Sequence, residues 1–466
     1  MGLQIHNSLT HKKEGFVPLE AGQVKMYVCG PNLYGPAHVG HAMSYVVFDT
    51  IRRYLEYRGY QVRHVQNFTD IEDRIIETAR AQGMAVEQLA EQYIARFFDE
   101  MDALNIQRAE AHPRATDVIP DMIQIVKVLI EKGFAYEVDG DVYFRVTKFP
   151  GYGKLSKRSL DQMEAGARVE VDPRKEHPMD FALWKASKKG EPSWDSPWGM
   201  GRPGWHIECS AMSMRYLGEQ LDIHGGGHDV LFPHHENEIA QSEAYTGKTP
   251  FVRYWMHNGL LGLGEDEEKM TRHLGNVISV QEALEKYSAD AIRLFLLSSH
   301  YRSSPTWSDT SVRAAERGAE RLRVALRDFP GSAEADPGGA LSDVAEAARR
   351  QFIRFMDDDF NTPQGIAQVF DLARAINQGR DSDTAPESLA YAQSVLEELT
   401  EVLGLTMKGL AGPTETEPFI SLLVQVRAQL REAKQWALAD RIREGLVELG
   451  VVLEDDPEGT TWKYTT

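Results

Sequence analysis

The chain has 466 residues, of which 42% are hydrophobic and 26% charged, as is typical of a globular protein with two or three domains. No apolar stretch approaches the roughly 20 residues of a membrane span, and the N-terminus lacks the apolar segment of a secretory signal, so we expect a cytoplasmic protein without a membrane partner. The formal net charge of -19 argues against indiscriminate binding to nucleic acid, and 2 cysteines argue against a disulfide framework.

The N-terminal part predicts an α/β domain. Residues 23–29 alternate apolar with other side chains and run into a Gly-Pro pair, which predicts a strand that ends in a loop. Residues 38–58 show helical spacing, and QVRHVQNFT at 61–69 predicts a second strand. A strand, a loop, a helix and a further strand begin a doubly wound parallel sheet, whose ligands bind at the carboxyl ends of the strands.

The rest of the chain predicts an insertion and then helices. Helical patterns dominate residues 85–131, and YEVDGDVYFRV predicts a hairpin that turns at its Asp-Gly pair. Residues 148–204 are rich in Gly, Pro and Trp with few periodic segments, which indicates an insertion into the sheet domain. After YRSSPTWSD the chain is strongly helical, with turn-rich stretches at 329–342 and 409–418 that predict linkers or long loops.

The loop that ends at His38 leads from the first strand to a helix N-terminus, where free N–H groups and the helix dipole favour an anion. His38 and His41 can donate hydrogen bonds to phosphate oxygens, and Gly40 leaves room for a base against the backbone. A helix cap or two buried, hydrogen-bonded histidines would explain the same residues, so both interpretations stay open.

A cluster of metal-binding residue types lies in HGGGHDVLFPHHENEIAQ, residues 224–241. If HHENEIAQSEAY is a helix, His234 and Glu238 lie one turn apart on one face, as two ligands of one metal do. With Cys29 and Cys209 they would make a tetrahedral site of two thiolates, an imidazole and a carboxylate, which suits zinc. The alternatives are a solvated polar helix start and two cysteines buried as small apolar residues.

EDEEKMTRHLGN, residues 265–276, has the composition of a mobile phosphate clamp late in the sheet domain. Lys269 and Arg272 would carry the positive charge, and Gly275 and Asn276 would close the turn. An exposed charged loop would have the same pattern.

Together these segments closely resemble the cysteinyl-tRNA synthetases, a family of class I aminoacyl-tRNA synthetases, over nearly the whole chain. The resemblance rests on these segments in family order: YVCGPNLYGPAHVGH, NFTDIEDRI, PRAT, AGARVEV, MDFALWK, GRPGWHIECSAM, HGGGHDVLFPHHENEIAQ, MDDDFNTP and LEDDPEGTTW. It implies that HVGH is the HIGH motif and that KMTRH stands in the place of KMSKS. It also implies activation of L-cysteine by ATP, with Mg²⁺, and transfer of the cysteinyl group to the terminal ribose of tRNA(Cys), by a monomer.

The implied fold is a Rossmann-type doubly wound parallel sheet as the catalytic domain, residues 1–310, with a connective insertion at about 110–204. A helical stem and bundle domain would follow at 311–408, and a small C-terminal anticodon-binding domain at 409–466.

The resemblance also assigns residues to each ligand. The family's zinc ligands fall on Cys29, Cys209, His234 and Glu238. Its cysteine pocket falls on Gly30, Thr69, Trp205 and Asp229. Its ATP site falls on His38, Gly40, His41, Lys269 and Arg272, of which all but the glycine are candidate catalytic residues. The resemblance favours a C-terminal anticodon-binding domain, for which charge, stacking and hydrogen bonding make Arg431, Trp436, Asp440 and Asp455 the candidates; without the resemblance an amphipathic helix with a charged outer face would explain this region.

Zinc explains how cysteine would be selected over serine. Ordinary contacts separate such near-isosteres by only about 10- to 200-fold. Zinc prefers the softer, more acidic thiol, so a thiolate on the metal would select cysteine without an editing domain.

One departure from the family is the KMTRH segment, where the guanidinium of Arg272 takes the place of a compact ammonium group. We expect activity to survive with an altered rate. Two alternatives are a ligase of the same fold that joins cysteine to a glucosaminyl-inositol, whose members lack the C-terminal region, and a non-catalytic paralogue that binds tRNA or cysteine.

Overall fold

The structure is a computed structural model that describes residues 2–165, 172–264, 268–269, 277–327, 338–380, 384–408, 417–456 and 459–464. The chain divides into a compact unit Met1–Met407 and a second unit Lys408–Thr466. In the described part of the chain, no helix has the length and apolar character needed to cross a membrane.

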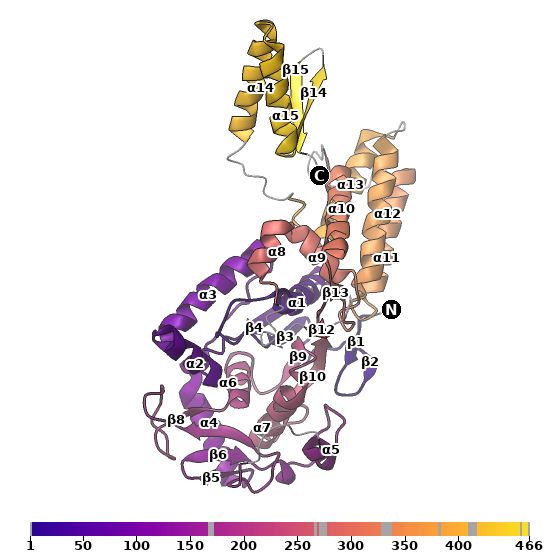
Figure 1. The fold of residues 1–466 in the computed structure, drawn as a ribbon. Helices are drawn as coiled ribbons and strands as arrows, with labels where there is room; N and C mark the ends of the chain where they lie inside the picture. The colour runs from indigo at the N-terminus through magenta and orange to yellow at the C-terminus, as the bar shows by residue number, and fades with distance from the viewer. Residues whose placement is uncertain are drawn as a thin grey trace. The chain divides into compact units, whose positions relative to one another are not determined.

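A parallel sheet of strand order β10-β9-β3-β4 lies at the centre of the first unit (Figure 1). Its strands are β3 (Gln23–Val28), β4 (Gln61–Gln66), β9 (Leu221–Gly227) and β10 (Val252–Asn258). Helix α1 (Val39–Tyr57) connects β3 to β4, which confirms the predicted strand, helix and strand order. Because β3 and β9 are parallel neighbours, with Val28 beside Gly225, their carboxyl ends lie at the same edge of the sheet.

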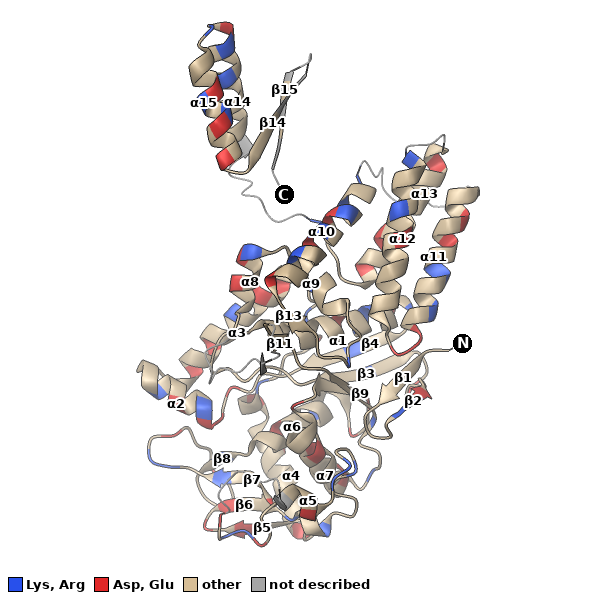
Figure 2. Cartoon of the chain, turned by 45° about the vertical axis from the view of Figure 1, so that its right-hand side comes forward, with Lys and Arg blue, Asp and Glu red and all other residues tan. Residues whose placement is uncertain are grey.

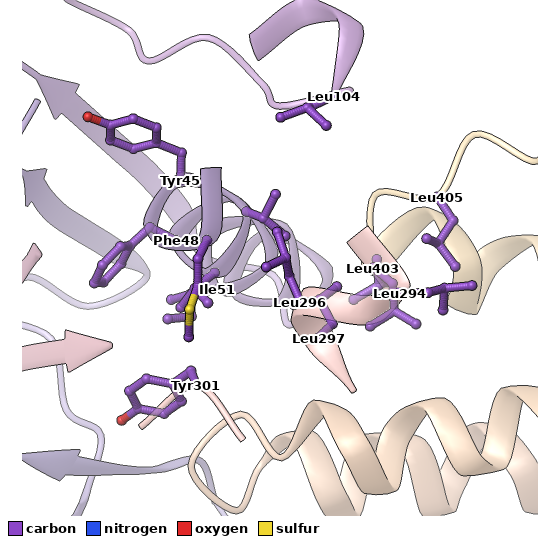
Figure 3. Packing of buried hydrophobic residues seen from close by; sticks show 14 of the residues in the cluster. Tyr45, Phe48, Ile51, Leu104, Leu294, Leu296, Leu297, Tyr301, Leu403 and Leu405 are labelled. Atoms are coloured by element: carbon purple, nitrogen blue, oxygen red, sulfur yellow. The ribbon is translucent and has the colours of Figure 1, made fainter. Parts of the chain in front are cut away.

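The core forms where α1 packs on the sheet and on α9 (Ala289–Leu297), as Figure 3 shows for Tyr45, Phe48, Ile51 and several leucines. This close packing requires glycine at position 225, because a Cβ on Gly225 would lie only 2.2 Å from the Phe48 ring. The contact between β9 and α1 therefore explains why one position of the HGGGH segment is a glycine.

The predicted hairpin is confirmed and belongs to an antiparallel sheet of order β5-β6-β7-β8. These strands are β5 (Ala135–Val138), β6 (Asp141–Phe144), β7 (Phe181–Ala186) and β8 (Gly201–Pro203). The stretch 148–204 thus has more regular structure than its pattern predicts, because β7 (FALWKA) has a continuous apolar run instead of an alternation and β8 has only 3 residues. It also contains the short helix α5 (Leu160–Ala165).

The predicted helical region 85–131 is interrupted. Its helices are α3 (Val86–Ala103) and α4 (Ile119–Glu131), preceded by the 3-10 turn η1 (Ala115–Val118). Between them Asn105 adopts a left-handed conformation, with φ 55°, which ends the first helix. The other helices around the sheets are α2 (Asp73–Gln82), α6 (Trp205–Leu217), α7 (Glu236–Thr246) and α8 (Val280–Lys286).

The remaining strands of the first unit are short. A hairpin at the N-terminus consists of β1 (Gln4–Asn7) and β2 (Lys12–Gly15). A small sheet of order β12-β11-β13 consists of β11 (Gly262–Leu263), β12 (Glu268–Lys269) and β13 (Thr306–Trp307).

The C-terminal part of the first unit is helical, as predicted. Its helices are α10 (Asp309–Ala325), α11 (Ala340–Met356), α12 (Thr362–Arg380) and α13 (Pro386–Val402). The predicted linker 329–342 overlaps the start of α11, and its residues 329–337 lie outside the described part of the chain. Likewise, residues 409–416 of the other predicted linker are not among the described ones.

The second unit combines the helices α14 (Glu417–Glu432) and α15 (Trp436–Glu448) with the antiparallel strands β14 (Val451–Asp456) and β15 (Gly459–Tyr464). Its buried core contains Ile420, Leu446, Val451 and Leu453. Acidic and basic residues occur on both helices (Figure 2).

Candidate functional site

The predicted metal ligands meet at the carboxyl edge of β3 and β9. Cys29 follows β3, and Cys209 lies in α6, which contacts β3. His234 lies in the irregular turn η3 (Leu231–His235), and Glu238 in the first turn of α7. The helix predicted to carry both residues begins only at Glu236, so His234 precedes it.

These four side chains lie close enough to share one ion. The two Sγ atoms are 3.8 Å apart, His234 Nε2 lies 3.4 Å from Cys209 Sγ, and the same nitrogen lies 3.0 Å from Glu238 Oε1. Two sulfurs at about 2.3 Å from a tetrahedral centre would lie about 3.8 Å apart. The separation of the two thiols therefore matches that expected around zinc.

Two further histidines border the cluster, and the sequence analysis missed them. His235 Nε2 lies 3.2 Å and His224 Nε2 3.7 Å from Cys29 Sγ. With Cys29 and Glu238 they form a second possible ligand set, whose donor atoms also lie within 4.8 Å of one another. His224 belongs to the buried strand β9, and its proximity to Cys29 depends on strand pairing that no local pattern reveals.

The electrostatics of the cluster favour a bound cation. Glu238 is fully buried, which raises its pKa, and its Oε1 lies 3.0 Å from Nε2 of His234. The pKa of Cys209 is well above its usual value because of its hydrogen bond to Cys29, its burial and the nearby negative groups. Burial lowers the pKa of His234, but the charges of Cys209 and Glu238 outweigh this effect and raise it to about 10. A metal ion would replace the protons that the buried acidic groups otherwise retain.

A chain of hydrogen bonds extends from the metal cluster across the carboxyl edge of β4. Asn67 Oδ1 accepts from Gly30 N at 2.9 Å, and Asn67 Nδ2 lies 3.4 Å from Thr69 Oγ1. Thr69 Oγ1 in turn donates to the buried Glu208 at 3.0 Å. A Cβ at Gly30 would lie 1.6 Å from Asn67 O, so the approach of the two loops requires glycine. Asn67 and Glu208 were not predicted.

The other two predicted pocket residues differ in their surroundings. The half-buried Trp205 ring lies over His234, with ring centroids 4.2 Å apart. Asp229 is exposed in the turn that follows β9, where the N–H of Val230 donates to Gly227 O. The structure thus brings Gly30, Thr69 and Trp205 to the metal cluster, whereas no described contact joins Asp229 to it.

The HVGH segment forms the start of α1, as predicted. The backbone N–H of His41 donates to His38 Nδ1, that of His38 donates to His41 Nδ1, and both distances are 3.3 Å. The two rings stack with centroids 3.7 Å apart. These contacts make His38 the cap of α1, with Gly40 in its first turn. A capping role and a phosphate-binding role are compatible, because both use the helix N-terminus.

The predicted phosphate clamp is only partly described. The backbone of Lys269 pairs with Gly262, whereas Arg272 lies outside the described residues. The chain that follows is attached to the start of α1: the N–H of Val39 donates to Ile278 O at 3.0 Å, and that of Val280 to Ala37 O at 3.1 Å. Residues 278–280, which follow the clamp in the sequence, therefore lie beside the start of α1.

In the second unit, Arg431, Trp436 and Asp440 have exposed side chains on or next to α14 and α15, and the Trp436 side chain is 56% exposed. Asp455 lies on β14, paired with Thr460 of β15. An exposed tryptophan beside charged residues is suited to stacking on a nucleic-acid base.

The chain matches two protein families. Residues 15–317 match the tRNA synthetases class I (C) catalytic domain, and residues 351–408 match the DALR domain.

Its sequence relatives span the full chain. The cysteine–tRNA ligase of Dehalococcoides mccartyi is 55% identical over 470 residues, which cover 99% of both chains. Those of Pelotomaculum thermopropionicum and Geobacillus thermodenitrificans are 51% and 50% identical, again over 99% of both chains.

Solved structures with the same fold include Mycobacterium tuberculosis methionyl-tRNA synthetase in complex with methionyl-adenylate, at a TM-score of 0.59 and 15% identity, covering 86% of this chain and 94% of that chain. An Agrobacterium radiobacter LeuRS in a ternary complex with tRNA and LeuAMS follows at a TM-score of 0.58 and 13% identity, covering 86% of each chain.

Proposed function

Because the chain belongs to the cysteine–tRNA ligase family of class I aminoacyl-tRNA synthetases, we propose that it selects cysteine with a zinc ion held by Cys29, Cys209, His234 and Glu238. The protein is an enzyme that uses ATP to join cysteine to tRNA. The observation that supports the metal site is a largely buried cluster of two thiols, an imidazole and a carboxylate, whose sulfur atoms lie 3.8 Å apart as around zinc.

Among the two possible ligand sets, we favour the one with two cysteines. Zinc in a nitrogen and sulfur site is well suited to two thiolates, and the 3.8 Å sulfur separation fits its geometry. The other set would leave Cys209 as a buried thiol 3.4 Å from His234. When bound, zinc supplies a Lewis acid that prefers a thiolate to an alcohol, which separates cysteine from serine.

The residues beside the metal would hold the rest of the amino acid. Gly30 has no side chain, which lets its backbone approach Asn67. The Thr69 hydroxyl is oriented by Glu208, and the Trp205 ring would cover the bound cysteine. Asp229 would attract the ammonium group as a nearby negative charge, since it is exposed at the end of β9.

The start of α1 would bind ATP. His38 and His41 would hold phosphate oxygens at the helix N-terminus, with Gly40 against the base and Mg²⁺ on the phosphates. Lys269 and Arg272 would stabilise the charge that develops when the cysteine carboxylate attacks the α-phosphorus and pyrophosphate leaves. The terminal ribose hydroxyl of the tRNA then attacks the carbonyl carbon of cysteinyl-adenylate, and AMP leaves.

We also propose a function for each domain. Residues 1–310 would be the catalytic domain, with the insertion at about 110–204, residues 311–408 the helical domain and 409–466 the anticodon-binding domain. In the last, Arg431, Trp436, Asp440 and Asp455 would contact tRNA(Cys), and the DALR match at residues 351–408 suggests that this region binds tRNA too. The alternative function as a glucosaminyl-inositol ligase is disfavoured, because the cysteine–tRNA ligase relatives match this chain through its C-terminal region. We infer a cytoplasmic monomer from the family.

The test is exchange of pyrophosphate into ATP, measured with cysteine and with serine on the zinc-loaded enzyme and on Cys209→Ser and Cys29→Ser variants. We expect the wild-type enzyme to respond to cysteine alone and both variants to lose most of this exchange together with their zinc. Full zinc content and unchanged cysteine-dependent exchange in either variant would refute the ligand assignment.

A further inference from the structure

The segment that carries two of the proposed zinc ligands begins with an irregular turn, in which the N–H of His235 donates to Val230 O five residues back. Within η3, Phe232 has extended backbone angles, φ -138° and ψ 130°, and α7 begins without a side-chain cap. His234 and Glu238 both follow Phe232, and His235 and Glu236 between them have helical backbone angles. The orientation of this segment toward the metal cluster therefore depends on what packs against it.

A segment of the insertion, residues 152–158, packs on this turn. We call it the strap. Tyr152 Oη donates to the side chain of Asn237, and the Arg158 guanidinium lies 5.5 Å from the Phe232 ring centroid. Lys154 forms an ion pair with Glu243 farther along α7. The strap thus contacts the turn before the helix, its first turn and its middle.

Glu236 makes the most extensive contact with the strap. Its side chain is buried, and its carboxylate accepts hydrogen bonds from the backbone N–H groups of Gly153 at 3.0 Å, Leu155 at 3.2 Å and Ser156 at 2.7 Å. The strap can curve around the carboxylate because Gly153 has φ 91°, and a Cβ there would lie 2.0 Å from Arg158 O. The backbone of the strap forms a concave site for one anionic side chain.

Glu236 lies between the two proposed zinc ligands in the sequence, so its contact with the strap affects both. It is two residues after His234 and two before Glu238, so a shift of its backbone moves both ligands. Buried hydrogen bonds to a charged group are among the stronger contacts in proteins. Groups that orient metal ligands in this way alter metal affinity about 10- to 100-fold when they are replaced.

We propose that Glu236 is a positioning residue that, through the strap, fixes His234 and Glu238 and thereby sets zinc affinity and cysteine selection. This inference rests on the proposed function, in which these two residues bind zinc. The insertion accordingly contributes to amino acid selection through backbone N–H groups, although none of its side chains is a proposed ligand.

The experiment compares Glu236→Gln with Glu243→Gln in the full-length enzyme. An amide retains one acceptor oxygen and presents an NH₂ group to backbone donors, so the strap loses part of its contact with Glu236. Glu243 is the matched control, because it is also a buried carboxylate of α7 that contacts the strap but lies more than a turn beyond Glu238. Zinc affinity is measured by competition with a chelator, and cobalt substitution reports ligand geometry through its visible absorption.

We expect Glu236→Gln to bind zinc about 10- to 100-fold more weakly, to shift the cobalt absorption and to raise KM for cysteine while KM for ATP stays within about twofold. Glu243→Gln should change these values by less than about threefold. Equal effects of both substitutions, or an unchanged zinc affinity in Glu236→Gln, would overturn the inference. Tyr152→Phe removes a single strap hydroxyl and should act in the same direction with a smaller effect, which keeps the test decisive if Glu236→Gln does not fold.

The proposed zinc ligands and the proposed role of the strap can be refuted independently of each other. If the wild-type enzyme binds no zinc, or if Cys209→Ser binds it as tightly as wild type, the ligand assignment itself is wrong. If wild type binds zinc, Cys209→Ser does not, and Glu236→Gln behaves as wild type, only the role of the strap is refuted.

Discussion

Replacement of Gly30 by alanine tests whether the loop after β3 must touch the loop after β4. The added Cβ would lie 1.6 Å from Asn67 O, and ordinary contact needs about 3.2 Å, so the two loops must separate by about 1.5 Å. This shift would lengthen the hydrogen bond from Gly30 N to Asn67 Oδ1, now 2.9 Å, beyond its useful range. Cys29 would move with its neighbour, far beyond the roughly 0.2 Å tolerance of a metal site.

We expect Gly30→Ala to lower kcat/KM for cysteine in pyrophosphate exchange at least about 100-fold, since a displacement of about 1 Å at a reacting centre has an effect of this size. Zinc content should fall as well. Gly15→Ala is the control, because a Cβ at Gly15 would meet no atom within 4 Å. Wild-type zinc content and cysteine activation in Gly30→Ala would show that the loop contact does not position Cys29.

Three other substitutions test separate parts of the structure. Arg293→Met should destabilise the first unit by about 3 kcal/mol in denaturant unfolding, because the buried Asp49 loses a charged partner at 2.6 Å; a loss under 1 kcal/mol would contradict this. Burial lowers the pKa of His64 to about 3, so the unfolded chain binds more protons between pH 6.5 and 3, and stability falls as pH falls through this range. At pH 5 the free energy of unfolding should be about 2 kcal/mol lower on account of His64. The His64→Leu variant should lack this loss when unfolding is measured at pH 7 and pH 5. An equal loss in both proteins would show that His64 is not its source. Trp436→Ala should raise KM for tRNA about 5- to 150-fold without changing pyrophosphate exchange. Leu449→Ala, which removes an even more exposed apolar side chain of the second unit, should not raise it; equal KM values would exclude stacking.

The sequence predicts those features that depend on local periodicity. The order of strand, helix and strand around α1 is visible in the spacing of apolar residues, and it is enough to predict the parallel sheet and the edge where ligands bind. The spacing of His234 and Glu238 likewise predicts their proximity, although the turn between β9 and α7 is not a regular helix.

Contacts between distant segments could not be predicted in the same way. His224 and His235 approach Cys29 only after β9 pairs with β3, which brings together residues about 200 positions apart. Glu208 has the pattern of a polar helix residue, and its burial follows from the packing of α6 against the sheet. The strands β7 and β8 could not be predicted, because β7 lacks an alternation of apolar and polar residues and β8 has only 3 residues.

X-ray absorption at the zinc edge of the wild-type enzyme tests the central claim most directly, because it counts sulfur ligands without any substitution. We expect two sulfurs at about 2.3 Å in the enzyme alone, from Cys29 and Cys209, and a third when cysteine is added but not when serine is added. A single sulfur in the free enzyme would assign the metal to the alternative set with His224 and His235. A sulfur count that does not change with cysteine would contradict selection of the substrate by its thiolate.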